Sequence, residues 1–301
     1  MIAAGIDIGT NTVRMIVADV IDGKISDILH QNRSVTRLGE GFIKTGFLRE
    51  DAIKRTFDVV VKFYREALSY NPFKVKCCAT SAVREAENGY IFTELLKGQG
   101  IEIEIIDGET EGRLTALGVM SGLNLGDEPS LIVDIGGGST ELIYLSGIDL
   151  NFAKSFKIGV VKLSDIFDFS MPCTEELLER VNLYIADCFT DFDFSIEIKN
   201  IVATAGTPTT LAAIDMQMEN YDYRKVNGYV ITEKRLNELI SFISSKDIEE
   251  RKMIKGLESG REDLIVPGSL MLRFLLNSFS KDRLIVSDFG LREGIVIAAA
   301  L

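Results

Sequence analysis

Residues 131–143, LIVDIGGGSTELI, decide the fold of the chain. An apolar run ends in an aspartate, passes three glycines and two hydroxyl residues, and reaches a glutamate before it becomes apolar again. This pattern predicts a strand, a tight turn and a second strand. Consecutive glycines leave backbone N–H groups uncovered by side chains, so the turn can cradle a phosphate, although a glycine-rich β-hairpin explains the turn equally well.

A second copy of the motif opens the chain at residues 5–12, GIDIGTNT. Aligning Asp7 with Asp134 and Gly9 with Gly136 makes an internal repeat of one hairpin, with one copy opening each half of the chain. Two facing loops of this kind can clamp one polyphosphate. The candidate phosphate-binding residues in the two loops are Gly9, Thr10, Asn11, Gly136, Gly137, Gly138, Ser139 and Thr140.

Carboxylates that arrive with these loops are candidate metal ligands. Mg²⁺ prefers a few carboxylates together with substrate phosphates and water. We therefore expect Asp134, with Glu141 and Asp7, to bind Mg²⁺ directly or through water. The chain has one histidine, His30, which excludes an HExxH site and makes a carboxylate the better candidate for a general base.

The bulk composition limits the classes of function. A length of 301 residues suggests two domains. The net charge of −12 argues against nucleic acid as a partner, because phosphate backbones are bound by clustered Lys and Arg. The N-terminus has no basic region, and no apolar stretch approaches the ~20 residues of a membrane span, so we expect a cytoplasmic protein without a membrane partner.

Apolar spacing and capping residues predict the other elements. We expect helices at 49–70, at 90–97, from 108 onward and at 174–189, and strands at 101–107 and 283–288. A strand, a Gly-Thr loop and a helix are expected across 199–214, and only helices from there to the last strand.

Five motifs in order along the chain carry a family resemblance: GIDIGTNTVRMIVAD, ATSAVREAENG, GETEGRLTALGV, VDIGGGSTEL and ATAGTPTTLAAI. Together they resemble the exopolyphosphatase/guanosine pentaphosphate phosphohydrolase (Ppx/GppA) family, in the superfamily of actin, sugar kinases and heat-shock ATPases. The resemblance implies an α/β chain of two ribonuclease H-like (actin-like ATPase) domains. Each domain has a mixed five-stranded sheet with flanking helices, and the active site lies in the cleft between them. We place the domains at 1–122 and 123–301, with a terminal helix that can pack back on the first.

The resemblance also implies a reaction, the release of terminal phosphate from inorganic polyphosphate, from pppGpp, or from both. The family's catalytic glutamate stands immediately before a small residue and an arginine, which matches Glu111. Thr110 departs from the family pattern, which usually has another glutamate there. Further phosphate contacts are assigned to Arg14 and Arg84, and candidate substrate contacts are Arg37, Gly206 and Thr207. Larger members continue into a helical region, so we expect this chain to be the two-domain form.

Several alternatives explain the same residues. Acidic residues in a first helical turn stabilise the helix dipole, which accounts for Glu111 without catalysis. A solvated loop accounts for Arg37, and a capped strand-to-helix turn accounts for Gly206 and Thr207. The rival functions are an ATP-dependent kinase of the same superfamily, a non-hydrolytic sensor of guanosine polyphosphates or polyphosphate, and an actin-like scaffold. A homodimer is a further candidate assembly.

Overall fold

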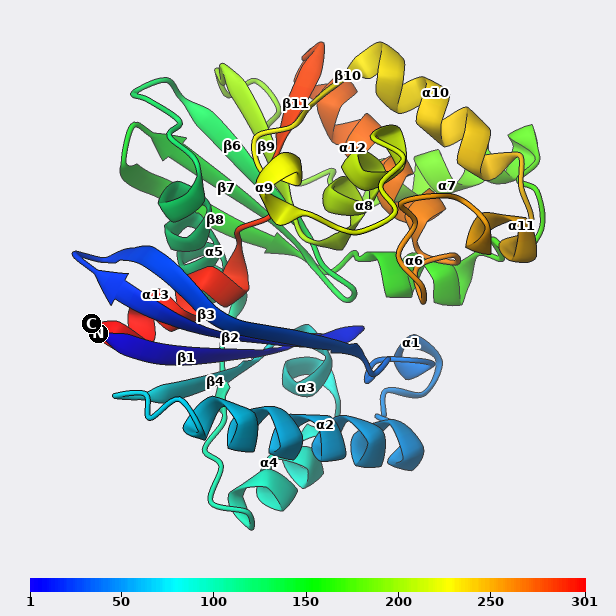
Figure 1. Cartoon of the computed structure of the whole chain (residues 1–301). Helices are drawn as coiled ribbons and strands as arrows, with labels where there is room; N and C mark the ends of the chain where they lie inside the picture. The colour runs from blue at the N-terminus through cyan, green and yellow to red at the C-terminus, as the bar shows by residue number, and fades with distance from the viewer. The chain divides into compact units, whose positions relative to one another are not determined.

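The computed structural model describes the backbone of residues 1–301 and every side chain except that of residue 43. Contacts divide the chain into two compact units. The first unit is Met1–Ser121 together with Phe289–Leu301, and the second is Gly122–Asp288 (Figure 1). Helix α13 (Leu291–Ala300), at the end of the chain, therefore belongs to the unit that also contains the N-terminus.

The first unit is built on a five-stranded sheet with the strand order β3-β2-β1-β4-β5. The first three strands form an antiparallel meander, and the last two run parallel to β1. The strands are β1 (Ile2–Ile8), β2 (Thr12–Ile21), β3 (Lys24–Val35), β4 (Val75–Ala79) and β5 (Glu104–Ile105).

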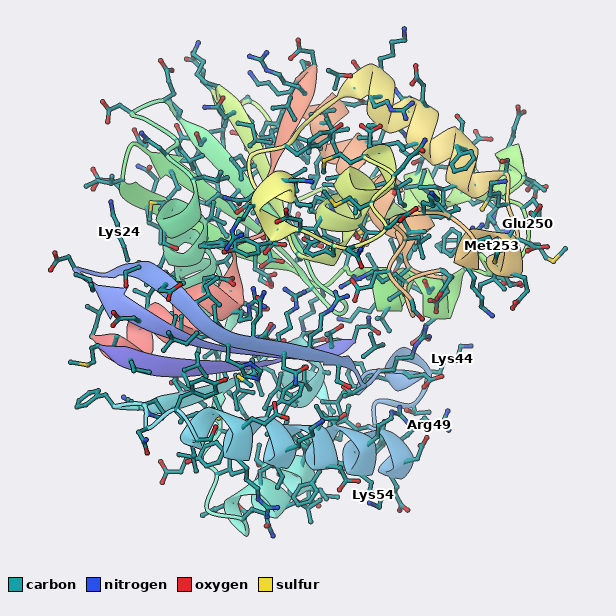
Figure 2. All side chains as sticks on the ribbon, viewed as in Figure 1. Lys24, Lys44, Arg49, Lys54, Glu250 and Met253 are labelled. Carbon is teal, nitrogen blue, oxygen red and sulfur yellow. The ribbon has the colours of Figure 1, made fainter. Side chains whose placement is uncertain are left out.

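Helices cover both faces of this sheet because β1 and β2 are apolar on both sides. Ala4, Ile6 and Ile8 belong to a core with α2 (Glu50–Leu68) and α4 (Gly89–Lys97). The alternate residue Ala3 packs with α13 on the opposite face, where α5 (Gly108–Gly122) adds Leu117. Lys54 lies on the exposed side of α2, and Lys24 lies at the β2–β3 turn (Figure 2). Two short helices complete the unit, α1 (Phe42–Thr45) and α3 (Ser81–Glu85).

The second unit is built on a six-stranded sheet with the order β10-β11-β9-β6-β7-β8. Strands β6 to β8 repeat the antiparallel meander, and β9 runs parallel to β6 and to β11. The strands are β6 (Ser130–Ile135), β7 (Thr140–Ser146), β8 (Asp149–Phe156), β9 (Asn200–Thr204), β10 (Val230–Thr232) and β11 (Arg283–Val286). Its helices are α6 (Val160–Ile166), α7 (Glu175–Cys188), α8 (Gly206–Asp215), α9 (Tyr223–Val226), α10 (Glu233–Ser244), α11 (Ile248–Lys252) and α12 (Ile265–Ser278).

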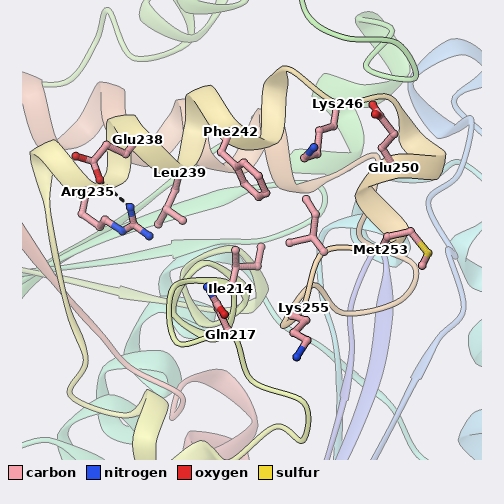
Figure 3. Close-up of a pocket in the computed structure, with 11 residues that line it drawn as sticks. Ile214, Gln217, Arg235, Glu238, Leu239, Phe242, Lys246, Glu250, Met253 and Lys255 are labelled. Carbon is pink, nitrogen blue, oxygen red and sulfur yellow. Dashed lines mark hydrogen bonds and ion pairs between the residues drawn. The ribbon is translucent and has the colours of Figure 1, made fainter.

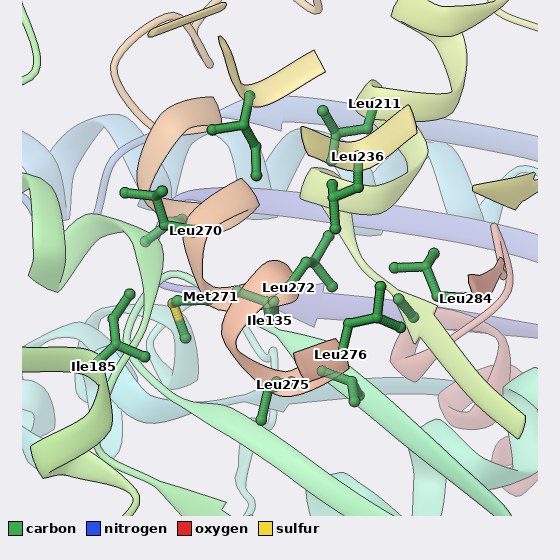
Figure 4. Close-up of a cluster of buried hydrophobic side chains, with 14 of the residues drawn as sticks. Ile135, Ile185, Leu211, Leu236, Leu270, Met271, Leu272, Leu275, Leu276 and Leu284 are labelled. Atoms are coloured by element: carbon green, nitrogen blue, oxygen red, sulfur yellow. The ribbon is translucent and has the colours of Figure 1, made fainter. Parts of the chain in front are cut away.

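Helix α12 is the centre of the second unit's core. Its side chains pack against α7, α8 and α10 and against β6 and β11, and a pocket opens between α8, α10 and α11 (Figure 3). Figure 4 shows the cluster, with Leu270, Leu272 and Leu276 of α12 among residues from the neighbouring helices and strands. Because α12 is buried nearly all round, it carries an almost unbroken apolar sequence.

The fold class predicted from the sequence is confirmed, with corrections in detail. The second sheet has six strands instead of five, because β10 pairs with β11 inside a segment predicted to be helical. The strand predicted at 101–107 is reduced to the two residues of β5. Among the helices the structure describes, none is both long and apolar enough to cross a bilayer.

Candidate functional site

The two repeated hairpins close with the same backbone hydrogen bond. The Gly9 N–H donates to the carbonyl of Thr12 at 3.1 Å, and the Gly136 N–H donates to that of Ser139 at 3.0 Å. A Cβ on either glycine would lie 3.0–3.1 Å from that same carbonyl oxygen. The sequence repeat is therefore also a structural repeat, one copy in each unit.

The segment that follows each three-stranded meander donates backbone hydrogen bonds to the turn. In the first unit, the Gly39 N–H donates to the carbonyl of Thr10 at 2.9 Å, and Thr36 and Arg37 donate to that of Asn11. In the second unit, the Val161 N–H donates to the carbonyl of Gly137 at 2.9 Å. The carbonyls of the turns are engaged in this way, which leaves the opposite side of each turn to its N–H groups.

Polar side chains of both turns are buried. In the first turn Thr10 and Asn11 are almost fully buried, and the amide oxygen of Asn11 has no hydrogen-bond partner among the described residues. In the second turn the Thr140 hydroxyl donates to the carbonyl of Ile158 at 2.7 Å, and Ser139 is buried beside it. A buried polar atom without a partner is costly, so the Asn11 oxygen marks a place where a hydrogen-bond donor, such as water, can complete the contacts.

The residues opposite the strand-ending aspartates differ between the repeats. Asp7 lies opposite Arg14, whereas Asp134 lies opposite Glu141. Directly opposed residues of antiparallel strands project from the same face about 5 Å apart. Asp134 and Glu141 are both buried, and the Ser155 hydroxyl donates to Glu141 at 2.7 Å. Two buried carboxylates side by side repel each other, so this pair fits a cation better than Asp7 does.

A metal ion held here would need ligands beyond the protein. Among the described residues there is no group of three His, Cys, Asp or Glu side chains that could hold a metal. Mg²⁺ commonly keeps several waters and completes its shell with substrate phosphates. The pair of Asp134 and Glu141 fits that mode of binding.

Two further residues of the first unit that were predicted to be functional, Arg84 and Glu111, lie at one edge of its sheet. Strands β1, β4 and β5 are parallel, so their C-terminal ends meet at the same edge. The first turn follows β1, Arg84 follows β4 on α3, and Glu111 follows β5 on α5. Burial raises the pKa of the Cys78 thiol to about 12, and the carboxylates of Asp7 and Glu111 add to this shift, as both lie near the thiol.

Arg84 and Glu111 form an ion pair at this edge. Arg84 Nη1 lies 3.2 Å from Glu111 Oε2 and 2.6 Å from the carbonyl oxygen of Ile106. The Glu111 side chain is 8% exposed. Glu109, in the same helical turn, is 62% exposed and pairs with Arg113 along the helix surface. The two acidic residues at the start of α5 thus differ in the structure. Glu111 is buried against Arg84, whereas Glu109 is exposed to solvent.

Arg37 and the Gly206 loop have distinctive geometries. Arg37 is half-buried and has a φ of 49°, in the left-handed region. Helix α8 begins at Gly206 after Ala205, whose φ is 73°, and no side chain caps the helix. Thr207 is buried, and a Cβ on Gly268 of α12 would lie 2.2 Å from its hydroxyl oxygen. These contacts show Thr207 packing against α12.

Arg261 and Lys162 are buried cations of the second unit that were not assigned from the sequence. A Cβ on Gly206 would lie 1.8 Å from Arg261 Nη1, so the guanidinium covers the first turn of α8. Arg261 also pairs with Glu258 at 2.7 Å. Lys162, on α6, is buried and follows directly on the segment that supports the second turn. A buried arginine packed on a glycine at a helix start has no local sequence signal that could have revealed it.

Comparisons with known proteins give a consistent result. The sequence model of the Ppx/GppA phosphatase family matches residues 16–301. A bifunctional 3-dehydroquinate synthase/phosphatase of Fusobacterium nucleatum is 30% identical over 299 residues, which are 95% of this chain and 44% of that relative. The chain thus spans less than half the length of that protein. Exopolyphosphatase 2 of Mycobacterium tuberculosis is 27% identical, with 99% of this chain and 98% of the relative covered.

Solved structures agree with the sequence comparisons. The Ppx/GppA family member of Aquifex aeolicus has a TM-score of 0.84 at 33% identity, with 100% of this chain and 97% of that one covered. An exopolyphosphatase from Cytophaga hutchinsonii has a TM-score of 0.90 at 28% identity, with 98% and 96% covered.

Proposed function

The chain belongs to the Ppx/GppA phosphatase family, and on this premise we propose that it hydrolyses the terminal phosphoanhydride bond of inorganic polyphosphate, with Mg²⁺ as cofactor and Glu111 as general base. The named relatives support this substrate, since exopolyphosphatases match over nearly the whole chain. The observation that carries the proposal is the buried Glu111 beside Arg84, at the sheet edge that also bears the first glycine turn.

Phosphoanhydride hydrolysis depends mainly on charge neutralisation and on the positioning of water, because the phosphate oxygens repel a nucleophile. The Glu111 carboxylate accepts a proton from water while the water oxygen bonds to the terminal phosphorus. The bond from that phosphorus to the bridging oxygen breaks, and the shortened chain leaves with the bonding electron pair. A positioned base of this kind contributes roughly 10²–10⁴-fold to the rate.

Arg84 has two tasks in this scheme. Both of its contacts in the structure, to Glu111 and to Ile106, are made through Nη1. A guanidinium carries five N–H donors, so one group can orient the base and still bind a phosphate oxygen. The backbone N–H groups of the two glycine turns are assigned to the other phosphate oxygens, together with the hydroxyl groups of Thr10 and Ser139 and the amide nitrogen of Asn11.

The Mg²⁺ site is assigned to the carboxylates of Asp134 and Glu141. When bound there, Mg²⁺ supplies positive charge to the phosphate oxygens. The chain carries a net charge of −12, so an anionic substrate needs a local positive field. Arg14, Arg37 and Arg84 in the first unit and Lys162 and Arg261 in the second are the cations assigned to that field.

Phosphate release from purified protein tests the proposal. Medium-chain polyphosphate and pppGpp are compared side by side, because pppGpp offers the same type of terminal anhydride. We expect release from polyphosphate in Mg²⁺ and none in EDTA. Faster release from pppGpp would move the substrate assignment to the nucleotide. Binding of both without release from either would refute the hydrolase and favour a sensor.

A further inference from the structure

The second unit contains a pocket that the proposed function does not use. It has a volume of about 540 Å³ and lies between the C-terminal end of α8, helix α10 and the segment from α11 to Lys255 (Figure 3). Pockets of roughly 300–1,000 Å³ are typical of small-molecule sites. The volume alone therefore admits a ligand of the size of a fused-ring compound with one substituent.

The pocket is separate from the groups assigned to phosphate. It is lined by Ile214 and Gln217, at the end of α8, whereas Gly206 and its covering Arg261 lie at the start of that helix. Helix α8 is ten residues long, which corresponds to about 15 Å. A compound in the pocket therefore lies well apart from a group bound at the start of α8.

The pocket presents an aromatic ring next to an amino group. Phe242 of α10 lines the pocket and is 47% exposed, a large fraction for a phenylalanine in a concave site. Lys246 Nζ lies 4.9 Å from the centre of that ring. Figure 3 shows both side chains directed into the same space, with Leu239 on the wall beside them. An apolar surface and a positive charge are thus within reach of one small molecule.

The other cations of the pocket are already paired. Arg235 lies 2.7 Å from Asp215 and 2.7 Å from Glu238, and Lys255 lies 2.9 Å from Glu219. Glu250, the other carboxylate of the lining, accepts a hydrogen bond from the Asp247 N–H at 3.0 Å. Lys246 instead contacts the aromatic ring of Phe242, so it can pair with an acidic group of a ligand.

We propose that this pocket binds a small amphipathic anion, a planar apolar ring system that carries one acidic group. The ring lies against Phe242 and Leu239, and the acidic group pairs with Lys246. A cation is repelled by the Lys246 ammonium group, and a neutral ring system cannot form an ion pair with it. The site goes beyond the proposed hydrolysis and does not depend on it.

Two fluorescent probes with the same ring system test the ligand chemistry. The anion is 1-anilinonaphthalene-8-sulfonate, and the neutral analogue is N-phenyl-1-naphthylamine. We expect saturable binding of the anion to the full-length protein, about fivefold tighter than the analogue, the size expected of a partly exposed ion pair. Lys246→Gln should lower the affinity for the anion about fivefold and leave the affinity for the neutral analogue unchanged. Phe242→Ala should lower the affinity for both probes. If the alanine variant is unstable, Phe242→Leu is used in its place.

Matched variants outside the pocket control for nonspecific binding of the probes to exposed apolar or basic side chains. Leu183→Ala removes a 65% exposed side chain on α7, and Lys199→Gln removes a 55% exposed lysine beside β9. Neither should change the affinity of either probe. Equal affinity for the two probes, or no effect of Lys246→Gln, would overturn the proposal.

Displacement by tripolyphosphate separates this site from the phosphate-binding turns. Tripolyphosphate without Mg²⁺ should leave the bound probe in place, because its proposed site is at the two glycine turns and not in this pocket. Release of the probe by tripolyphosphate would place the probe at the turns and overturn the second site. The probe experiment does not depend on hydrolase activity. The proposed pocket ligand and the proposed hydrolysis can therefore be refuted separately.

Discussion

Arg84 Nη1 lies 3.2 Å from Oε2 of Glu111, and this ion pair is largely buried at the edge of the first sheet. Glu109 stands two residues earlier in the same helical turn, yet its side chain is solvated and pairs with Arg113 at 2.7 Å. Both glutamates suit the positive end of α5 equally well. Their burial is what distinguishes a candidate base from a surface residue.

Glu111→Gln should remove most turnover while the substrate still binds. The amide keeps the shape of the side chain but cannot accept a proton from water, so we expect a loss of at least about 100-fold in kcat. Phosphate release and polyphosphate binding are measured on the same preparation. Glu109→Gln is the matched control and should retain nearly normal turnover. Near-normal kcat in Glu111→Gln, or an equal loss in both variants, contradicts the assignment.

Arg84→Gln should destabilise the first unit. Removing one partner of a buried ion pair costs roughly 3–5 kcal/mol, and we expect about 2–3 kcal/mol here because the Arg84 side chain keeps 22% exposure. Urea unfolding measures the change. In the double variant with Glu111→Gln, the loss should shrink by about 1–3 kcal/mol, since the buried carboxylate no longer lacks its partner. Arg113→Gln, which breaks the exposed pair, should change stability by no more than about 0.5 kcal/mol.

The local pattern of the sequence was enough to predict the two turns. Glycine at positions 9 and 136, with apolar strands on both sides, requires the same tight hairpin in each half, and the structure shows the same closing hydrogen bond. The α/β class followed from the same repeat and its family resemblance. The roles of the individual residues in the turns stay predictions.

Features that depend on tertiary neighbours could not be predicted in this way. β10 has three β-branched residues that favour a strand, but a run of three is too short to predict one without its neighbour β11. Arg261 reaches Gly206 across a separation of 55 positions (261 minus 206), and only the folded chain brings them together. Helix-dipole reasoning treats Glu109 and Glu111 alike, and the family resemblance favours Glu111, but its burial is seen only in the folded chain.

Gly39→Ala should impair the first turn through a steric clash that a second substitution relieves. A Cβ on Gly39 would lie 2.3 Å from the methyl carbon of Thr10, a buried residue of that turn. Thr is stiff about χ1, so the turn must shift, and we expect kcat/KM to fall at least about tenfold. Thr10→Ser removes the methyl and keeps the hydroxyl, so the double variant should recover most of the activity. No loss in Gly39→Ala, or no recovery in the double variant, would show that the turn does not position the substrate.

Glu141→Gln should have opposite effects on stability and on the response to Mg²⁺. In EDTA, an amide opposite Asp134 relieves the repulsion between two buried carboxylates, and it still accepts the hydrogen bond from Ser155. We therefore expect a gain of about 1 kcal/mol in the unfolding free energy without metal. We expect Mg²⁺ to raise the Tm of the unsubstituted protein by binding to its folded state, and Glu141→Gln should largely lose this rise. Asp149→Asn, at the exposed end of the same sheet, should alter neither quantity. A variant that is less stable in EDTA and still responds fully to Mg²⁺ would place the metal elsewhere.

Alkaline pH should destabilise the first unit through its adjacent thiols. Burial raises the pKa of Cys77 and of Cys78 from the usual 9.0 to about 12 in the folded protein. Both thiols are protonated in either state below pH 9, so their contribution to stability is complete there. As the pH rises toward 12, the unfolded chain loses these protons first, and the unfolding free energy falls. Urea unfolding at pH 8 and pH 10.5 measures the slope, and Cys78→Ala should reduce it. Tyrosines and lysines also titrate in this range, so an unchanged slope in that variant would assign the effect to them and not to the thiols.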